Sequence, residues 1–300
     1  TGDVRQDGDA SEYTFEATPL KANGMLYFCT PHNEVHALDP ETGAVKWKHV
    51  PEKDRSNLQQ HQTCRGVSYF DSAAAGAETA PAEPALCRKR IFNATTDAKL
   101  VALDADTGKF CADFGNNGVV DLHANMGEVR PHALMQTAAP LVAGNLVIVG
   151  GSVMDNGFNS GNPSGVIRAY DAVTGRLVWN FDPATPENTQ PIAADKNYPY
   201  DTPVAWGTLS ADMKNGLVYV PFGNASPDEL GIERDANSNT EKFRDALVAL
   251  DLKTGAFKWR YQSSNHDLWD RDNPSQPSLL DSDYQGNKQP VGVLPPNPGN

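Results

Sequence analysis

Long hydrophobic runs are absent from this chain of 300 residues. The longest apolar stretch lies around residues 141–149, and a membrane-spanning helix needs about 18 apolar residues or more. No positively charged segment precedes an apolar one, so we expect neither a membrane-embedded segment nor a signal peptide within these residues. The sequence begins abruptly at Thr1 and stops at Asn300 in a proline-rich run, and we expect both ends to be cuts in a longer protein.

Basic residues are also few, because 25 Lys and Arg face 38 Asp and Glu, which gives a formal net charge of −13. A protein that binds nucleic acid needs clustered Lys and Arg, so nucleic acid is excluded as a partner. The seven His residues show no metal-ligand spacing, which argues against zinc or copper.

Cysteine is limited to four residues, Cys29, Cys64, Cys87 and Cys111, and none of them forms a CxxC pair. This spacing argues against a zinc ribbon or a redox dithiol. Cys87 and Cys111 flank a short apolar stretch and a turn that could bring them together. Paired and free thiols both remain open for these two residues, and a disulfide would indicate an oxidising compartment.

Helical periodicity is scarce, and 25 Gly and 22 Pro residues punctuate a chain that repeats itself. Four segments share the pattern Ala-x-Asp-x-x-Thr-Gly, and they cover residues 37–47, 102–112, 169–179 and 249–259. In each, an apolar strand ends at an Asp whose carboxylate can accept backbone N–H groups, and the Gly supplies a positive φ. The strand that follows carries a Trp in three of the four segments, namely Trp47, Trp179 and Trp259.

This pattern predicts a β-hairpin at each repeat. Further strands are expected just before the motifs, at residues 25–29, 90–92, 146–149 and 217–220. Four-stranded units of this kind are typical of β-propeller blades, here enlarged by loops such as residues 71–84 and 182–201. We therefore expect an all-β fold with one domain over residues 1–300. Four motifs are too few to close a ring of such blades, so the propeller is expected to be partial.

The repeat resembles the tryptophan-docking motif of dehydrogenases that use pyrroloquinoline quinone (PQQ). Further strings are similar to the membrane-bound glucose dehydrogenase branch of that family, which includes quinate and polyol dehydrogenases: Thr30-Pro-His-Asn33, His61-Gln-Thr-Cys-Arg65-Gly-Val, Phe114-Gly-Asn-Asn-Gly118, Pro163-Ser-Gly-Val-Ile-Arg168 and His266-Asp-Leu-Trp-Asp270. The resemblance spans essentially the whole chain. It implies about the first half of an eight-bladed propeller.

For the parent protein, the resemblance implies oxidation of a sugar, polyol or cyclic hydroxy acid, glucose or quinate foremost, by hydride transfer to PQQ. Electrons would pass to membrane ubiquinone at the periplasmic face of the bacterial inner membrane. A membrane anchor would lie outside these residues. Two alternatives are a non-catalytic propeller scaffold built from the same repeat, and an enzyme fragment that is inactive because half of the ring is missing.

The resemblance also implies the catalytic residues. Asp270 matches the base that takes the proton of the substrate hydroxyl, and His61 matches a His close to the cofactor. Asp272 is expected to assist with a metal ion. From the residues alone, Asp267, Asp270 and Asp272 would be read as an acidic surface turn.

A hard divalent cation, Ca²⁺ or Mg²⁺, is implied at carboxylate and amide oxygens. By resemblance its ligands are Asp155 and Asn224, with Asn156 close by. Without the resemblance, both segments would be ordinary turns, because Asn and Asp are common there.

Trp206 lies outside the register of the three repeat tryptophans and matches the aromatic floor on which PQQ stacks. Arg65 matches a clamp for a PQQ carboxylate, since a guanidinium can bind a carboxylate with two hydrogen bonds. Further positions that match contacts to the cofactor are Glu16, Thr137 and Ser152. From the residues alone, Trp206 would be assigned to core packing.

One position departs from the glucose branch. A Lys in a Lys-Thr-Gly-Asn string lies near the quinone oxygen in that branch, and here Asn297 occupies the matching place in a proline-rich segment. A cation there would stabilise negative charge on the reduced quinone, which an Asn does less well. A different electrostatic partner, a slipped alignment among the prolines and divergence from the family all remain open.

Overall fold

The computed structural model describes residues 9, 13–52, 61–76, 86–154, 160–284 and 287–294. Strands dominate these residues, and the described helices are two short 3₁₀ turns, η1 (Gly231–Glu233) and η2 (Thr240–Phe243). Neither is long and apolar enough to cross a membrane. The predicted all-β class is confirmed.

Four antiparallel sheets of four strands succeed one another along the chain, each with its strands in sequence order. Sheet 1 holds β1 (Leu20–Ala22), β2 (Met25–Cys29), β3 (Val35–Leu38) and β4 (Val45–His49). Sheet 2 holds β5 (Ser68–Asp71), β6 (Lys89–Ala94), β7 (Lys99–Asp104) and β8 (Val119–Asp121). Sheet 3 holds β10 (Leu141–Ala143), β11 (Leu146–Val149), β13 (Ile167–Asp171) and β14 (Leu177–Phe181). Sheet 4 holds β15 (Ser210–Asp212), β16 (Leu217–Phe222), β17 (Ala246–Asp251) and β18 (Phe257–Gln262).

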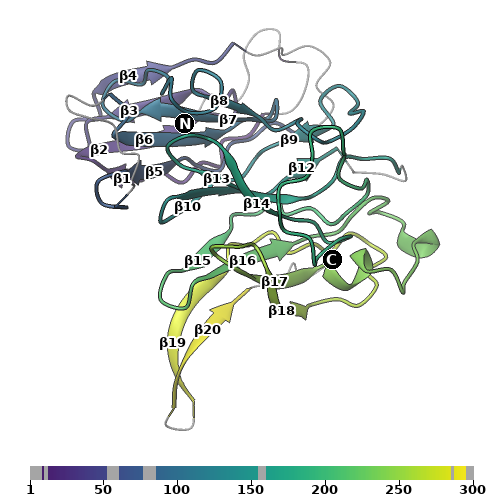
Figure 1. Cartoon of the computed structure of the whole chain (residues 1–300). Coiled ribbons are helices and arrows are strands. Elements are labelled where there is room, and N and C mark those ends of the chain that lie inside the picture. The colour runs from purple at the N-terminus through teal and green to yellow at the C-terminus, as the bar shows by residue number, and fades with distance from the viewer. Residues whose placement is uncertain are drawn as a thin grey trace.

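Two shorter pairs complete the described fold. Strand β9 (Leu134–Met135) pairs with β12 (Ser152–Val153), and β19 (Ser278–Tyr284) pairs with β20 (Asn287–Val293). The first strands of successive sheets are neighbours, because β10 contacts both β5 and β15, and β15 contacts β19. Figure 1 shows the sheets following one another from purple to green, with the yellow β19–β20 hairpin extending beyond sheet 4. The described sheets form an open arc, which confirms the partial propeller.

The repeated turn has the geometry that the sequence predicts. In sheet 3 the Asp171 Oδ1 atom accepts the Thr174 N–H at 2.7 Å, and Gly175 follows with φ +72°. The corresponding glycines Gly43, Gly108 and Gly255 all have φ +71°. Each turn joins the third and fourth strands of its sheet, apart from the one in sheet 2.

Two repeat tryptophans join one sheet to the next. The indole Nε1 of Trp47 donates to the Ala105 carbonyl at 2.9 Å, and that of Trp179 donates to the Leu252 carbonyl at 3.0 Å. Both acceptors lie in the repeat turn of the following sheet, so each Trp docks its blade on the next. Trp259 in sheet 4 is 40 % exposed, and β19–β20 is the described part of the sheet that follows.

The second repeat departs from the prediction. No strand starts directly after Gly108, where a bridge pairs Leu103 with Phe110, and the outer strand β8 begins at Val119. This repeat also has no docking Trp. Instead, buried Arg90 donates to the Val173 carbonyl of sheet 3 at 2.8 Å and to Asp113 at 2.5 Å.

Both pairs of cysteines form disulfides. Cys87 is bonded to Cys111, the pairing that the sequence left open, and it sits beside Arg90, which donates to the Cys87 carbonyl at 2.9 Å. Cys29 is bonded to Cys64, a link between β2 and the segment before β5 that the sequence did not indicate.

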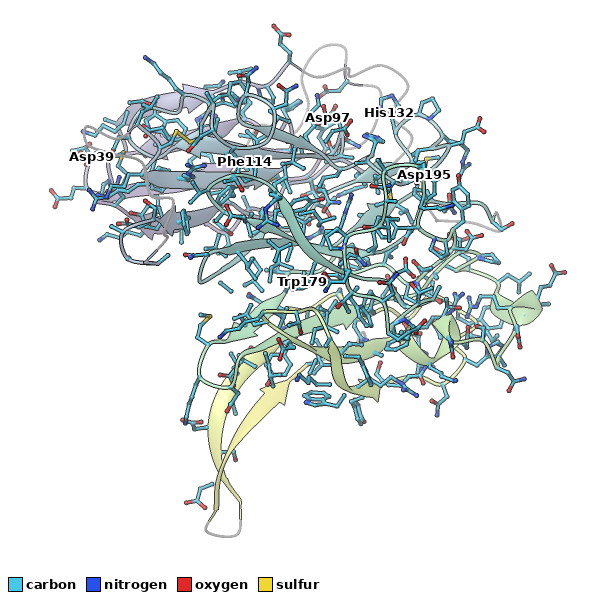
Figure 2. The ribbon with its side chains drawn as sticks, viewed as in Figure 1. Asp39, Asp97, Phe114, His132, Trp179 and Asp195 are labelled. Atoms are coloured by element: carbon cyan, nitrogen blue, oxygen red, sulfur yellow. A yellow bond between two sulfur atoms is a disulfide. The ribbon has the colours of Figure 1, made fainter. Side chains whose placement is uncertain are left out.

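Apolar side chains fill the spaces between neighbouring sheets. One cluster lies between sheets 2 and 3 and includes Phe92, Phe114 and Tyr170. A second lies between sheets 3 and 4 and includes Trp179 and Phe222. Figure 2 labels Phe114 and Trp179 within these layers. Sheets 2 and 3 are therefore packed against a neighbouring sheet on both faces.

Candidate functional site

Most predicted site residues lie a few positions before the first strand of a sheet. Glu16 precedes β1, Arg65 precedes β5, and Thr137 precedes β10. Trp206 precedes β15, and Asp270 and Asp272 precede β19. Because the first strands are neighbours around the open arc, the segments that lead into them meet at one end of it. This placement explains how residues more than 200 positions apart in the sequence come together.

The first group of contacts is centred on Glu16. Its Oε2 atom lies 2.9 Å from Arg65 Nη2, and its Oε1 atom lies 3.5 Å from His61 Nε2. Thr14 Oγ1 donates to Glu16 Oε1 at 3.0 Å and also makes a hydrogen bond with His61. Burial by itself would raise the pKa of Glu16, but the Arg65 charge and the hydrogen bonds from Thr14 and His61 hold it below its usual value. Glu16 is therefore an anion that orients Arg65.

Arg65 connects this group to the aromatic floor. Its guanidinium carbon lies 4.9 Å from the centroid of the half-buried Trp206 ring. The Trp206 Nε1 atom donates to Asp272 Oδ2 at 2.8 Å, and Asp272 Oδ1 accepts the Asn224 backbone N–H at 2.6 Å. One unbroken series of contacts thus runs Glu16–Arg65–Trp206–Asp272–Asn224.

A group of carboxyls surrounds the far end of this series. Burial, together with the charges of Asp272, Asp228 and Asp267, raises the pKa of Asp270 to about 7. Burial likewise raises the pKa of Asp272. Such crowding of like charges is stable only if protons or a cation neutralise part of it.

Asp245 belongs to the same group, and sequence reasoning missed it. Burial, followed by the charges of Asp267, Asp272 and Asp270, raises its pKa to about 8. Among the described residues, neither of its carboxylate oxygens has a hydrogen-bond partner. No local signal marks Asp245 in the sequence, because it lies in a charged loop before β17 and outside every motif.

Asn224 is placed in this group, but its side-chain oxygen is already engaged. The Oδ1 atom accepts the Ala225 N–H at 2.9 Å and Arg244 Nη1 at 3.3 Å. The amide nitrogen faces Asp267 Oδ2 at 3.3 Å. A metal ion at Oδ1, as the sequence predicts, therefore requires Asn224 to release one of these donors.

The remaining predicted residues fall into two sets. The Thr137 carbonyl accepts the Arg65 N–H at 2.9 Å, and Ser152 lies in β12, where the neighbouring Gly151 bridges Ala205 beside Trp206. Asp155, Asn156 and Asn297 lie outside the described residues.

The residues present fit a flat tri-carboxylate such as PQQ. Within the described part of the chain, the buried atoms Arg65 Nη1 and Thr137 Oγ1 have no hydrogen-bond partner. Buried donors without partners cost free energy, so an acceptor such as a carboxylate would satisfy them. Trp206 adds a partly open aromatic ring beside them, and the acidic group suits a hard cation.

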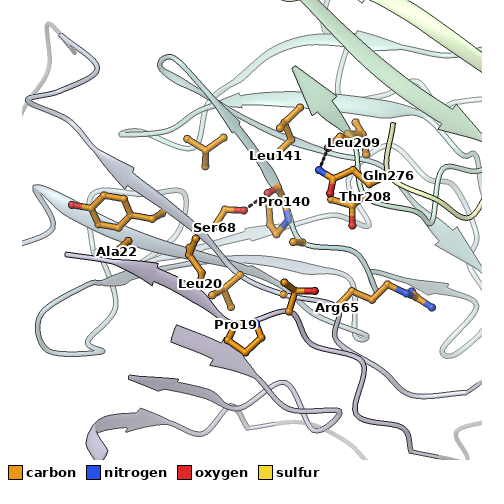
Figure 3. Close-up of a pocket in the computed structure, with 16 residues that line it drawn as sticks. Pro19, Leu20, Ala22, Arg65, Ser68, Pro140, Leu141, Thr208, Leu209 and Gln276 are labelled. Atoms are coloured by element: carbon orange, nitrogen blue, oxygen red, sulfur yellow. Dashed lines mark hydrogen bonds between the residues drawn. The ribbon is translucent and has the colours of Figure 1, made fainter. Parts of the chain in front are cut away.

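A cavity of ≈ 500 Å³ adjoins this site. The first strands and the segments that lead into them line it with mainly apolar residues, among them Leu20, Pro140 and Leu141. Arg65 is the predicted site residue in its lining, and in Figure 3 its guanidinium extends away from Ser68 and Pro140. The cavity is therefore the space along the axis of the arc, and the polar site lies beside it.

The comparison with protein families agrees with this arrangement. The family model of the glucose/ethanol/alcohol dehydrogenase β-propeller domain, designated PQQ, matches residues 1–297. The chain belongs to this family.

Relatives point to the same branch. Quinoprotein glucose dehydrogenase of Escherichia coli (strain K12) is 40 % identical over 301 residues, which cover 100 % of this chain and 37 % of that protein. Quinate/shikimate dehydrogenase (quinone) of Acinetobacter baylyi is 37 % identical, over 93 % of this chain and 35 % of that protein. The chain thus spans little more than a third of the length of these relatives.

Among solved structures, quinohemoprotein alcohol dehydrogenase from Comamonas testosteroni superposes with a TM-score of 0.66 at 25 % identity. The match covers 94 % of this chain and 40 % of that one. A second quinohemoprotein alcohol dehydrogenase, from Pseudomonas putida HK5, gives a TM-score of 0.71 at 24 % identity, over 98 % of this chain and 40 % of that one, and this supports the propeller fold.

Proposed function

We propose that the complete protein is a quinoprotein dehydrogenase that oxidises an alcohol group of a sugar, polyol or cyclic hydroxy acid. Glucose and quinate are the foremost candidates, because relatives of both names match the whole or nearly the whole chain. The observation that carries the proposal is the series Glu16–Arg65–Trp206–Asp272–Asn224. A propeller that serves only as a scaffold has no need of such a series of polar contacts beside an open aromatic ring.

In this proposal the cofactor is held by Arg65, Thr137, Ser152 and Trp206, with Glu16 orienting Arg65. Bound PQQ supplies the acceptor for the two electrons that leave the substrate as a hydride. Arg65 is suited to a carboxylate because its Nη2 is bound by Glu16 while its Nη1 is unpartnered in the described structure. We assign His61 to the edge of the same site, and its contacts with Glu16 and Thr14 support this assignment.

Asp270 acts as the general base. It takes the proton of the substrate hydroxyl while the hydride leaves the carbon that bears this hydroxyl. Without a bound cation, burial and the neighbouring carboxylates raise the pKa of Asp270 to about 7, so that it is largely ionised above neutral pH, as a general base must be.

The metal ion of the proposal is Ca²⁺, with Mg²⁺ as the alternative. Its ligands are Asp155, Asn156, Asn224 and Asp272, and the unpaired negative charge of the neighbouring carboxyls supports a cation there. A cation would also lower the pKa of Asp270 and keep this residue in its basic form.

The proposed localisation of the complete protein is the periplasmic face of the bacterial inner membrane. The two disulfides support this proposal, because disulfides persist in oxidising compartments. Membrane ubiquinone is the proposed electron acceptor, with the membrane anchor outside these 300 residues.

The experiment is a dye-reduction assay on the full-length protein with PQQ, Ca²⁺ and glucose, quinate or glycerol. We expect reduction that requires both additions. Asp270→Asn should abolish turnover and spare PQQ binding, whereas the control Asp281→Asn, on an exposed side chain of β19, should leave the rate unchanged. Full activity of Asp270→Asn would overturn the assignment of the base, and the absence of any PQQ-dependent oxidation would overturn the proposed function.

A further inference from the structure

A largely buried ionic network lies next to the acidic group, and its central residue belongs to none of the sequence motifs. Its centre is Glu241 in η2, whose side chain is 4 % exposed. Glu241 Oε2 lies 2.7 Å from Arg244 Nε and 3.7 Å from Arg234 Nε. Glu241 Oε1 lies 2.6 Å from His266 Nδ1. One carboxylate thus forms ion pairs with two arginines and a hydrogen bond with His266.

Each of the three basic side chains is tied to a segment of the proposed site. Arg244 Nη1 donates to the Ala225 carbonyl at 2.6 Å and to Asn224 Oδ1 at 3.3 Å. Arg234 Nη1 donates to the Pro227 carbonyl at 2.6 Å.

The catalytic string is held in the same way. Arg234 Nη2 donates to the backbone carbonyl of Asp267. His266 begins the string that ends at Asp270. The network therefore contacts both the segment that carries Asn224 and the segment that carries Asp270.

The catalytic segment needs such support from outside. His266, Asp270 and Asp272 have φ of +49°, +58° and +50°, a region that residues other than Gly seldom adopt. A backbone of this kind persists only where surrounding contacts fix it. Within the segment itself, Asp267 supplies part of the support, since its carboxylate accepts the Trp269 and Arg271 N–H groups.

The two arginines, in turn, depend on Glu241. The side chains of Arg234 and Arg244 are 4 % and 5 % exposed. Burial, followed by the positive charge of Arg234, lowers the pKa of Arg244. Without a carboxylate between them, two buried like charges repel each other and move apart or recruit water. Either response releases the contacts to the Ala225 carbonyl, next to Asn224, and to the Asp267 carbonyl.

We propose that Glu241 is a positioning residue that, through Arg244 and Arg234, sets the places of Asn224 and of the segment that carries Asp270. The inference rests on the proposed function and adds a residue that touches neither substrate nor cofactor. It predicts that Glu241 governs the affinity of the site for its metal ion.

The test is a Ca²⁺ titration of the full-length protein in the presence of PQQ, followed by tryptophan fluorescence. Glu241→Gln keeps the size of the side chain and removes its charge. Loss of a group that orients metal ligands weakens metal binding by about 10- to 100-fold, and we expect a rise of this size in the Ca²⁺ midpoint. We also expect a drop in kcat that exceeds the change in KM.

Two variants make the result specific. Arg244→Lys keeps a positive charge beside Glu241 but lacks the second nitrogen that donates to the Ala225 carbonyl. The backbone next to Asn224 then loses this support, so the variant should also raise the Ca²⁺ midpoint. Asp113→Asn is the matched control, because it removes the carboxylate partner of buried Arg90 in sheet 2. The control should lower stability and leave the Ca²⁺ midpoint unchanged.

The outcomes separate the two proposals. If the unaltered protein shows no response to PQQ and Ca²⁺, the proposed function is wrong. If it responds, and Glu241→Gln titrates with the same midpoint, the positioning role is wrong. If Glu241→Gln does not fold, Arg244→Lys decides, and a midpoint equal to that of the unaltered protein contradicts the inference. A midpoint raised equally in Asp113→Asn would also contradict it.

Discussion

The docking of one blade on the next can be tested at two glycines with the same backbone. Gly43 and Gly255 both follow Thr in the repeat turn, and both have φ +71°. A Cβ atom added at Gly43 meets nothing within 4 Å, whereas one added at Gly255 lies 2.6 Å from Cε3 of Trp179. Replacing each by Ala therefore separates backbone strain from the loss of docking.

The expected sizes follow from these contacts. The left-handed backbone costs a non-Gly residue about 1–2 kcal/mol, which is the whole expected effect of Gly43→Ala. Trp179 cannot move aside easily, because it is 1 % exposed and its Nε1 is bonded to Leu252. Overpacking of a buried group costs about 1–3 kcal/mol more, so Gly255→Ala should lose about 2–5 kcal/mol of unfolding free energy by adding the two terms.

The assay is urea denaturation of the unaltered protein and both variants, followed by circular dichroism and tryptophan fluorescence. Gly255→Ala should unfold at clearly lower urea than Gly43→Ala. Because Trp206 and Asn224 adjoin β15 and β16 of sheet 4, which docks on sheet 3 through Trp179, Gly255→Ala should also weaken PQQ binding. Equal destabilisation of the two variants would refute the docking argument.

Three further predictions concern the site and the disulfides. Arg65→Lys keeps the charge but loses the planar fork, so titration should show PQQ binding weakened by about 10-fold or more; unchanged affinity would remove Arg65 from the site. In calcium-free protein the pKa of Asp245 is raised to about 8, so the free energy of unfolding should decrease as the pH rises from about 4 to about 8. For this group the decrease is at most about 1.4 kcal/mol per pH unit. Urea curves at several pH values would show this slope, and Asp245→Asn should flatten it; a slope that persists unchanged would contradict the assignment. Replacing Cys87 and Cys111 by Ser should lower the free energy of unfolding by about 2–4 kcal/mol through loss of the cross-link. Urea denaturation of this variant and of the unaltered protein under oxidising conditions measures the difference, and an unchanged free energy would contradict a stabilising role for the disulfide beside Arg90.

The sequence alone was enough for the parts of the fold that are local. Asp171 and Gly175 lie four residues apart, so the turn they make is written in one short string, and the strands at residues 25–29 and 146–149 have the bounds that the sequence predicts. The prediction that the outer strand of the second repeat follows its turn directly was wrong. This repeat lacks the docking Trp, and Arg90 contacts sheet 3 instead.

The site could be predicted only where a motif carried its residues. Arg65, Trp206 and Asp272 were named by resemblance, and the structure joins them by contacts. Glu241 lies in η2 and Asp245 in the short loop between η2 and β17, and no sequence motif covers either residue. Their surroundings arise from the packing of sheet 4 against the segment before β19. The Cys29–Cys64 link was missed for the same reason, since it depends on how sheet 1 meets the segment before sheet 2.

The central claim is that segments from different sheets meet to form one site for PQQ and a cation. A crystal structure of the full-length protein with PQQ and Ca²⁺ tests it most directly. The account predicts PQQ stacked on Trp206, one of its carboxylates bonded to Arg65, and Ca²⁺ within coordination distance of Asp272. PQQ bound instead in the apolar cavity beside Leu20 and Leu141, or a cation remote from Asp272, would contradict it.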